Sequence, residues 1–341
     1  MVVTSVLPSL PPPSAELPLA NCKVWADWMA AEGTEPPELA WLQWRRGGIG
    51  ASESAAVCGL GPWSSPYAVW LDKTGQLPLW RQPTEAMRWG NRLEPAVADA
   101  FAEEHDTVVF DRGLPVEHRE EPWLRATLDG LAMVDGEVCV VELKTSNGRD
   151  GAWDEGVPLQ YQVQVQHQLL VTGLQAGYVA VLLGGSEYRS YRIERDEPAI
   201  LALLTTLRRF WFDHVVPRAA PAVDGSPATG EALRTAFAKA QPRTVLLPLE
   251  AEELLQELRD AKAAIKDAEA RETAAQNRVM ALLADADQGA IGDQVVVTWK
   301  EQTSRRVDIE RLRKERQEIA EEFTKEQTTR VLRLVRRRDG V

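Results

Sequence analysis

The sequence predicts an α/β protein in which a mixed central β-sheet is flanked by helices and followed by a C-terminal helical/β extension. Helical periodicity occurs on both sides of a strand-rich stretch at residues 107–145. That stretch contains Asp135-Gly136 between two apolar runs, which is a strong signal for a β-hairpin. After a linker rich in Pro and Ala, the pattern changes to a long helical seam that marks the extension.

The elements before the sheet are predominantly helical in pattern. Residues 1–20 are Pro-rich and are expected to form a disordered leader. Residues 21–46 show helix-like spacing of apolar side chains, and Pro66–Leu71 begins another helix. Gly90–Glu104 is a strong amphipathic helix. After a glycine-rich turn, Ser52 is a plausible N-cap of a short helix, whose free N–H groups would suit a phosphate.

The hairpin brings two acidic residues together. If Asp135-Gly136 is the turn, counting outward along both strands places Asp129 directly opposite Glu142. Strand alternation puts Lys144 on the same face as Glu142. Three residues then face the other way: Cys139, Val141 and Leu143. Val108–Phe110 is expected to be a strand that precedes the hairpin.

Two carboxylates and an ammonium at one spot suggest a divalent-metal site beside a lysine, suited to chemistry on phosphate. The alternative is that the Glu-x-Lys pair lies on a solvated strand edge, which is the usual outcome for such a pair. Opposed acidic side chains destabilise a sheet unless a cation lies between them. Geometry alone leaves both interpretations open.

The segment 158–172 has mixed signals. Its Gln/Val alternation resembles a strand, but its length and the initial Pro158 favour a helix. In a helix, Tyr161, Gln164 and Gln168 share one face, which in most proteins would be exposed to solvent. Two strands and a helix complete the predicted domain: Gly177–Leu183, Tyr188–Ile193 and Glu197–Val216.

The sequence divides into a main domain at residues 21–217, a linker at 218–230 and an extension at 231–341. Apolar residues from Ala251 to Leu282 follow alternating steps of three and four, interrupted at Glu272. This seam fits a coiled coil or a long helix packed on its own protein. Three further segments are expected to be a strand, a charged helix and a short, basic, strand-like end: Asp293–Lys300, Asp308–Gln327 and Arg330–Arg338. Such a basic end is ordinarily solvated surface, and contact with DNA is the alternative.

Composition restricts the class of protein. The 341 residues have ordinary apolar and charged fractions of 44% and 26%, and no apolar run is long enough to span a membrane. Three widely spaced cysteines argue against a disulfide scaffold, a zinc site or an iron–sulfur cluster, and favour the cytoplasm. A net charge of −12 argues against a surface that is basic throughout, although a local basic channel is compatible with it.

Several sequence blocks, taken in order, resemble the YqaJ-like viral recombinases, relatives of phage lambda exonuclease in the PD-(D/E)XK nuclease superfamily. The resemblance covers residues 40–215, and Val297–Lys300 resembles a recurrent feature of longer members. The matching blocks are Trp44–Ser52, Pro62–Trp70, Lys73–Gly75, Gly90–Pro95, Leu128–Gly130, Val141–Lys144 and Tyr161–Gln166. The resemblance implies a restriction-endonuclease-like core.

The resemblance also implies an activity. Family members are magnesium-dependent exonucleases that degrade linear double-stranded DNA from the 5′ end and leave a single strand for recombination. Two Mg²⁺ ions are expected as cofactors, with Mn²⁺ as a substitute. The implied partners are double-stranded DNA ends and a single-strand annealing protein, without a membrane, and processive members form rings of identical subunits.

Site residues follow from the matched blocks. The resemblance implies that Asp129, Glu142 and the backbone carbonyl of Leu143 bind metal. It also implies that Lys144 orients or activates water or stabilises phosphate charge, and that Glu94 is the helical acid near the metals.

The resemblance gives four further residues roles in binding DNA or its 5′-phosphate. Arg45 and Ser52 have the spacing of the pair that grips the 5′-phosphate, and Tyr161 and Gln164 match a motif on the helix beside the site. Two alternatives remain: an endonuclease or repair nuclease on the same scaffold, and a catalytically silent DNA-binding scaffold for recombination.

Overall fold

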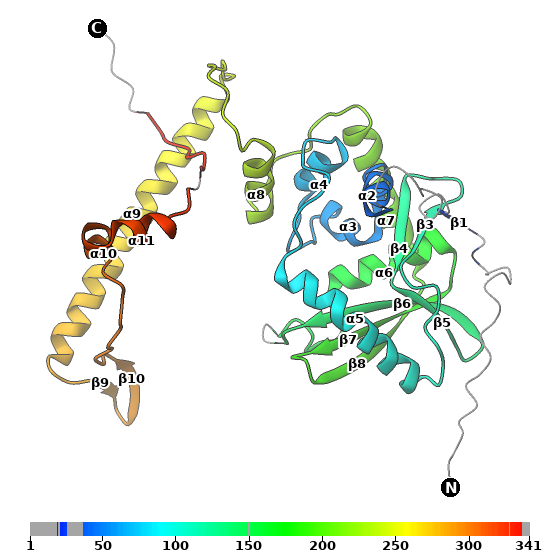
Figure 1. The fold of residues 1–341 in the computed structure, drawn as a ribbon, viewed down its shortest axis with the longest axis horizontal. Helices are drawn as coiled ribbons and strands as arrows, with labels where there is room; N and C mark the ends of the chain where they lie inside the picture. The colour runs from blue at the N-terminus through cyan, green and yellow to red at the C-terminus, as the bar shows by residue number, and fades with distance from the viewer. Residues whose placement is uncertain (1–18, 20, 26–36, 149–150, 327, 336–341) are drawn as a thin grey trace. The chain divides into compact units, whose positions relative to one another are not determined.

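The computed structural model describes residues 19, 21–25, 37–148, 151–326 and 328–335. It divides into two compact parts: an N-terminal unit, Met1–Ala238, and a C-terminal unit, Lys239–Val341 (Figure 1). The leader expected at residues 1–20 falls almost entirely outside the described residues. In the described part of the chain, no helix combines the length and apolarity needed to cross a membrane.

The central sheet of the N-terminal unit is mixed, and its strand order is β5-β6-β7-β8. Neighbours pair antiparallel at both edges, while β6 and β7 pair parallel in the middle. The parallel pair requires a crossover, which α6 provides (Figure 1). The bounds of these elements are β5 Gly130–Val134, β6 Glu137–Ser146, α6 Leu159–Thr172, β7 Ala176–Leu183 and β8 Glu187–Glu194.

The hairpin prediction is confirmed in its register. Val134 pairs with Glu137, and the ladder continues outward to Gly130 opposite Val141. Asp135 and Gly136 both have positive φ, 51° and 81°, as the two central residues of a type I′ hairpin turn require. The ladder ends one residue before Asp129, which lies at a bend rather than within a strand.

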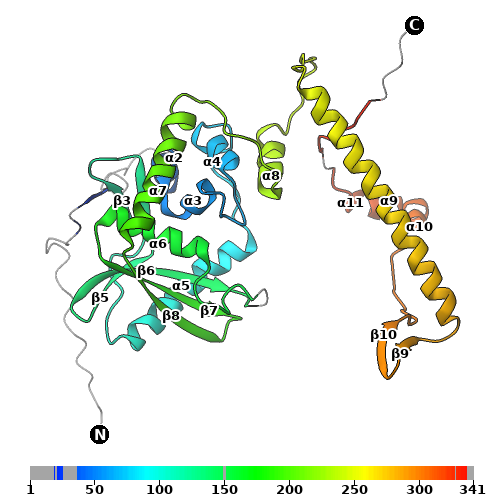
Figure 2. The ribbon, with the colours of Figure 1, turned by 180° about the vertical axis from the view of Figure 1, so that it is seen from behind.

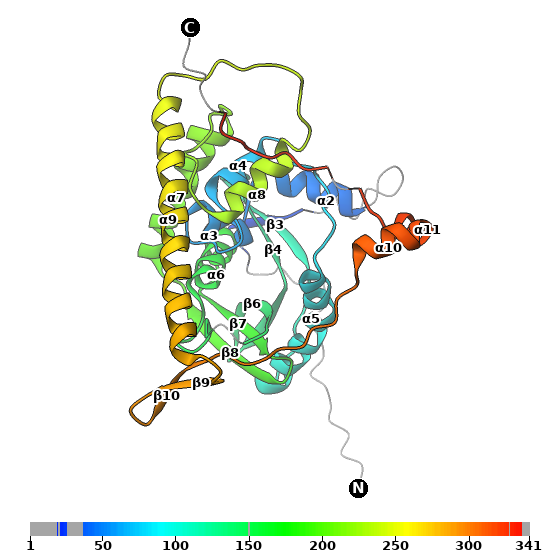
Figure 3. The ribbon, with the colours of Figure 1, turned by 90° about the vertical axis from the view of Figure 1, so that its left-hand side faces the viewer.

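Helices cover both faces of this sheet, so the predicted α/β architecture of a mixed sheet flanked by helices is confirmed. On one face α5, Glu85–Glu104, packs Val97 and Phe101 against Cys139, Val141 and neighbouring side chains. On the other face α6 packs Val165 and Leu169 in one cluster with Val140 and Val179. Figure 3 shows α5 and α6 on opposite sides of β6 and β7.

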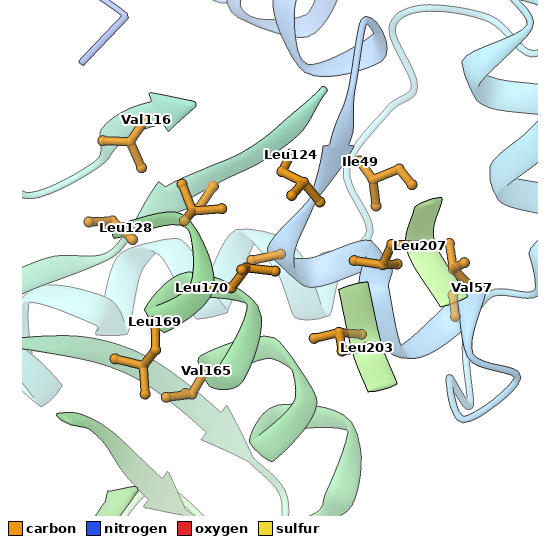
Figure 4. Close-up of a cluster of buried hydrophobic side chains, with 14 of the residues drawn as sticks. Ile49, Val57, Val116, Leu124, Leu128, Val165, Leu169, Leu170, Leu203 and Leu207 are labelled. Atoms are coloured by element: carbon orange, nitrogen blue, oxygen red, sulfur yellow. The ribbon is translucent and has the colours of Figure 1, made fainter. Parts of the chain in front are cut away.

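A second, smaller sheet lies beyond α6, and the sequence did not predict it. Its strand order is β1-β3-β4-β2, and its strands are β1 Cys22–Val24, β3 Leu114–His118, β4 Leu124–Leu128 and β2 Ile49–Gly50. Figure 4 shows Val116, Leu124 and Leu128 of this sheet close to Leu169 and Leu170 of α6. Helix α6 is therefore enclosed between the two sheets, which explains why so many of its side chains are buried.

Several local predictions need correction. Val108–Phe110 is not a strand, because only Phe110 forms a bridge, with Leu131. Ser52 is not an N-cap: α3, Ala51–Val57, begins after Gly50, whose backbone N–H donates to Glu53 Oε2 at 2.8 Å. The region predicted as helical at residues 21–46 contains β1 and then α2, Pro37–Arg46. The helix predicted from Gly90 begins earlier, after the cap Thr84.

The remaining elements of the N-terminal unit are α4 Pro66–Lys73, α7 Glu197–Phe210, a π-helical turn at Trp211–Val215 and α8 Pro227–Ala236 (Figure 2). The first turn of α8 falls within the segment expected as a linker. Its Thr229 is buried and bonded to Ser65 at 2.6 Å, so α8 is attached to α4. All three cysteines are free thiols.

The C-terminal unit contains the long helix α9, Ala251–Leu283, which confirms the predicted seam as helical. A two-stranded ribbon follows, of β9, Gln288–Ile291, and β10, Gln294–Thr298. The predicted charged helix is broken at Arg316 into α10, Ile309–Glu315, and α11, Gln317–Glu322. The described part of the basic end, up to residue 335, contains no strand.

Candidate active site

Strand β6 places Glu142 and Lys144 on the face of the sheet that α6 covers. Glu142 is 1% exposed, so its carboxylate requires partners. Gln164 Nε2 donates to Glu142 Oε1 at 2.5 Å, and Gln168 Nε2 donates to Oε2 at 2.5 Å. Lys144 Nζ forms an ion pair with the same carboxylate. Each carboxylate oxygen is thus fixed by a donor from α6.

Asp129 approaches from the bend between β4 and β5. Its Oδ2 accepts a hydrogen bond from the backbone N–H of Leu143 at 2.9 Å, so the side chain is anchored to β6 just beyond the last rung of the ladder. The bend needs glycine at the next position. A Cβ on Gly130 would lie 2.3 Å from Val109 Cγ1, a distance that no side chain could adopt without displacing its neighbour.

The two carboxylates interact electrostatically. Burial, together with the negative charge of Glu142, raises the pKa of Asp129 to about 8. Burial alone would lower the pKa of Lys144, but the charges of Glu142 and Asp129 outweigh it and raise that pKa. If both carboxylates were charged, they would carry more negative charge than the single ammonium neutralises, and a further cation would favour ionisation of Asp129.

Glu94 on α5 lies within electrostatic range of this pair, since its charge also contributes to the raised pKa of Asp129. Its carboxylate is held by Arg112, with Nη2 to Oε1 at 2.9 Å. In the described residues, no group of three or more His, Cys, Asp or Glu side chains lies close enough to hold a metal ion by itself. A metal here would take carboxylate oxygens from Asp129 and Glu142 and complete its shell with other oxygens.

Arg45 and Ser52 form a separate polar cluster. Arg45 Nη2 donates to Ser52 Oγ at 2.8 Å, and its guanidinium is 3.7 Å from Glu53. Beneath them the buried Lys73 Nζ lies 2.7 Å from Glu53 Oε2. Burial opposes ionisation of Glu53, but the charges of Lys73 and Arg45 outweigh it and hold its pKa below the usual value. Lys73 Nζ is also 3.8 Å from Asp72, which pairs with Arg46 at 2.9 Å, so three cations and two anions leave an excess positive charge beside the exposed Ser52 hydroxyl.

An open groove of about 950 Å³ is lined by Thr145, the residue after Lys144, and by Tyr161. Tyr161 borders it, stacks on Trp153 with ring centroids 5.4 Å apart, and has Lys144 Nζ 5.2 Å from its ring centre. Trp63 and Trp89 also line the groove, and they are 73% and 51% exposed. Exposed aromatic faces in a groove provide surfaces on which flat rings can stack.

Comparison with known proteins identifies the family. A model of the YqaJ-like viral recombinase domain matches residues 40–175. The uncharacterized protein YqaJ of Bacillus subtilis (strain 168) is 33% identical over 301 residues, which cover 87% of this chain and 93% of the relative. The chain belongs to the YqaJ-like viral recombinase family.

Solved structures give weaker likenesses. The alkaline exonuclease LHK-Exo of Laribacter hongkongensis is 21% identical with a TM-score of 0.44, covering 53% of this chain and 93% of its own. The structure of LHK-Exo in complex with dAMP is 22% identical with a TM-score of 0.45, and the match again covers 53% of this chain and 93% of that one. A phage related exonuclease from Haemophilus somnus is 11% identical with a TM-score of 0.32, and the match covers 57% of this chain and 90% of that one. These values support no transfer of activity.

Within the family domain, the structure brings some of the predicted residues together and separates others. Asp129 bonds to the backbone N–H of Leu143 and lies within electrostatic range of the Glu142–Lys144 pair, and Glu94 on α5 also acts on Asp129 electrostatically. The cluster of Arg45 and Ser52 is built from α2 and α3. Tyr161 lines the groove.

The glutamines of α6 depart from expectation. Gln164, expected to contact DNA, is 8% exposed and bonds to Glu142 instead. Gln168 was not among the predicted site residues, yet it is fully buried on the same carboxylate. Its spacing of four from Gln164 placed both on one helical face, and this was the available signal. That face is buried against β6 rather than exposed to solvent.

Proposed function

We propose that this chain is a metal-dependent deoxyribonuclease that hydrolyses linear double-stranded DNA from the 5′ end and leaves single strands for recombination. The observation that carries the proposal is the grouping of Asp129, Glu142 and Lys144, with the Lys144 ammonium 5.2 Å from the ring of Tyr161, which lines an open groove. Family membership supports a role in recombination.

Asp129 and Glu142 would hold the metal, with the backbone carbonyl of Leu143 and with help from Glu94. The donors are hard oxygens, which suit Mg²⁺ or Mn²⁺, and the pKa of Asp129, raised to about 8, fits a place where a cation is needed. When bound, one or two such ions supply positive charge to the attacking and leaving oxygens of the phosphodiester.

The chain's own residues have separable roles. Gln164 and Gln168 fix the orientation of Glu142, so that its oxygens point at one place. Lys144 carries an ammonium that would donate to the reacting phosphate or to the water that attacks it. Its contact with the ring of Tyr161 holds that ammonium beside the groove.

The other features would select the DNA end. Arg45 and Ser52 offer a guanidinium and a hydroxyl to a terminal 5′-phosphate, which would set the direction of degradation. The aromatic side chains of the groove would stack unpaired bases next to the reacting bond. A ring-shaped homo-oligomer and an annealing protein that receives the single strand remain parts of this proposal.

The test uses purified full-length chain and linear duplex labelled separately at each strand, with Mg²⁺ or with EDTA. We expect shortening from the 5′ end that requires Mg²⁺, and loss of activity in Lys144→Ala without loss of folding. Wild-type digestion by Lys144→Ala would refute the assignment. Covalently closed circular duplex serves as the control substrate, since its degradation at the same rate would favour the endonuclease alternative.

A further inference from the structure

The long helix of the C-terminal unit exposes an apolar seam. Leu254, Ile265 and Leu282 are 65%, 58% and 87% exposed. Within the described residues of the C-terminal unit, no other helix or strand makes an extended contact along α9. Only its last residue is covered, where Leu283 is buried next to Gly289 of β9. A 33-residue helix with an open apolar seam needs a partner of matching length.

The seam has a strict heptad spacing. Alternating steps of three and four connect Ala251, Leu254, Leu258, Ala261, Ile265, Ala268, Glu272, Ala275, Val279 and Leu282. In heptad terms the a positions begin at Ala251, and the d positions begin at Leu254. The a positions carry mainly large side chains together with Glu272, while three consecutive d positions carry alanine. This asymmetry between a and d indicates how two copies would fit.

We infer that α9 pairs with α9 of a second copy of this chain as an antiparallel coiled coil. In that arrangement each a residue faces a d residue of the other helix, and one register sets large against small. Leu258 faces Ala275, Ile265 faces Ala268, and the outermost alanine, Ala251, faces Leu282. A parallel pair would instead stack four Ala–Ala layers, three of them consecutive d layers, which leave space unfilled, and would place Glu272 against Glu272 of the other copy.

Charges flanking the seam agree with the same register. In an antiparallel pair, e positions face e positions and g positions face g positions. Lys262 then lies opposite Glu269, and Glu257 lies opposite Arg278. Because the pair is symmetric, each of these contacts occurs twice. No like charges oppose one another at these flanking positions, and Glu272 faces the small Ala261 with space to reach water.

This pairing is independent of the proposed nuclease activity, and disulfide cross-linking of the full chain tests it. The double variant Leu258→Cys/Ala275→Cys should form a covalent dimer on mild oxidation, because position 258 of each copy faces position 275 of the other across the seam. The single variant Leu258→Cys should not form a covalent dimer, since position 258 of the second copy lies about 25 Å away along the helix axis. A strong cross-link by Leu258→Cys alone would overturn the antiparallel arrangement.

The matched control places the second cysteine on the neighbouring residue. Leu258→Cys/Ala274→Cys has the same composition, but Ala274 lies outside the a and d positions, so the dimer should form only at the level of the parent chain. The parent controls for the three native cysteines. Equal yields from the two double variants, or none from Leu258→Cys/Ala275→Cys, would overturn the proposal.

A charge exchange supplies a second test that leaves the seam intact. Lys262→Glu should weaken pairing about tenfold, since two attractive contacts become repulsive. Adding Glu269→Lys should restore it, whereas Glu257→Lys should not. The control Lys266→Glu changes an exposed lysine outside the seam and should have no effect. Rescue by Glu257→Lys instead of Glu269→Lys would identify a parallel pair and contradict the inference.

Discussion

At the scale of single residues, the main feature of the site is that each oxygen of Glu142 has its own donor. Gln168 donates to Oε2 from a fully buried position, and Gln164 and Lys144 share Oε1. A carboxylate fixed in this way presents its remaining lone pairs in one direction. Removing a side chain that hydrogen-bonds to a metal ligand typically lowers metal affinity or activity about 10–100-fold.

Gln168→Leu is therefore expected to lower the rate of DNA degradation about tenfold and to raise the Mg²⁺ concentration needed for half-maximal activity. Leucine fills similar space but leaves Oε2 of Glu142 without its donor. The measurement is the initial rate over a Mg²⁺ titration, with circular dichroism to verify folding. Gln162→Leu is the control, since Gln162 is exposed and bonds only to the carbonyl of Val157. An unchanged Mg²⁺ requirement in Gln168→Leu would contradict this role.

A second prediction at the residue scale concerns phosphate binding by the guanidinium of Arg45. Its guanidinium lies beside the exposed Ser52 hydroxyl, where a terminal phosphate would accept from both. We expect Arg45→Ala to slow degradation of 5′-phosphorylated ends about tenfold, and 5′-hydroxyl ends much less, because a hydrogen bond to a charged group contributes roughly 1.5–3 kcal/mol. Rates on matched duplexes decide the question. Arg209→Ala changes an exposed arginine of α7 and serves as the control; equal slowing on both ends would refute the phosphate contact.

At the scale of elements, the hairpin was the most predictable part of the fold. An Asp-Gly pair that can adopt positive φ fixes the turn, and period-two alternation then fixes which side chains share a face. The convergence of Asp129, Glu142 and Lys144 follows from those two local rules. Family blocks added the cluster of Arg45 and Ser52, which no local rule predicts.

Elements that depend on distant pairing were not predictable. Strands β1 and β2 have three and two residues and are defined only by their partners β3 and β4. The glutamines of α6 were expected to face solvent, because their burial depends on a carboxylate delivered by β6. Ser52 was expected to cap α3, but the side chain of Glu53 bonds to the Gly50 N–H instead.

The enclosure of α6 between two sheets leads to a prediction about pH. His167 is fully buried, and in the described part of the chain neither ring nitrogen has a well-formed hydrogen bond. Burial, opposed only in part by the charge of Glu53, lowers the pKa of His167 to about 4. In the unfolded chain the pKa is about 6.5, so the unfolded state binds the proton more readily.

The part of the folding stability that depends on His167 should therefore be fully present above pH 6.5 and be lost as pH falls from about 6.5 towards 4, by about 3 kcal/mol in total. Urea unfolding at several pH values measures it. His167→Leu, of similar volume and without a titrating group, should lack this part of the acid sensitivity. If both proteins lose the same stability over that range, His167 is not the cause.

At the scale of the whole molecule, charge is distributed unevenly between the two units. Residues 239–341 contain 20 basic and 20 acidic side chains, so the formal charge of −12 belongs to residues 1–238. Under the proposed function, DNA approaching that unit would rely on local, accessible positive groups such as Arg45 rather than on a general attraction. This makes the placement of those few cations more important than their number.

The connection between the units gives the last prediction. Residues 239–250 contain no helix or strand, yet they carry apolar side chains that are almost wholly exposed, with Leu246 at 98% and Leu249 at 87%. Exposed backbone without regular structure is the preferred substrate of a protease. Of the cuts made by thermolysin within the described residues, the first should therefore fall at residues 245–249 and release two fragments that resist further digestion.

Mass spectrometry of a digestion time course identifies the first site, because thermolysin cuts before apolar residues and leaves a distinct mass for each position. The compactness of the N-terminal unit predicts that the fragment ending near residue 245 persists, since its helices and strands pack in two buried apolar clusters, one on each face of the central sheet. Pairing of α9 as proposed would protect the second fragment as well, because backbone held in a packed helix is cut slowly. First cuts inside α9 would show that the helix opens more readily than the connection, contrary to both expectations.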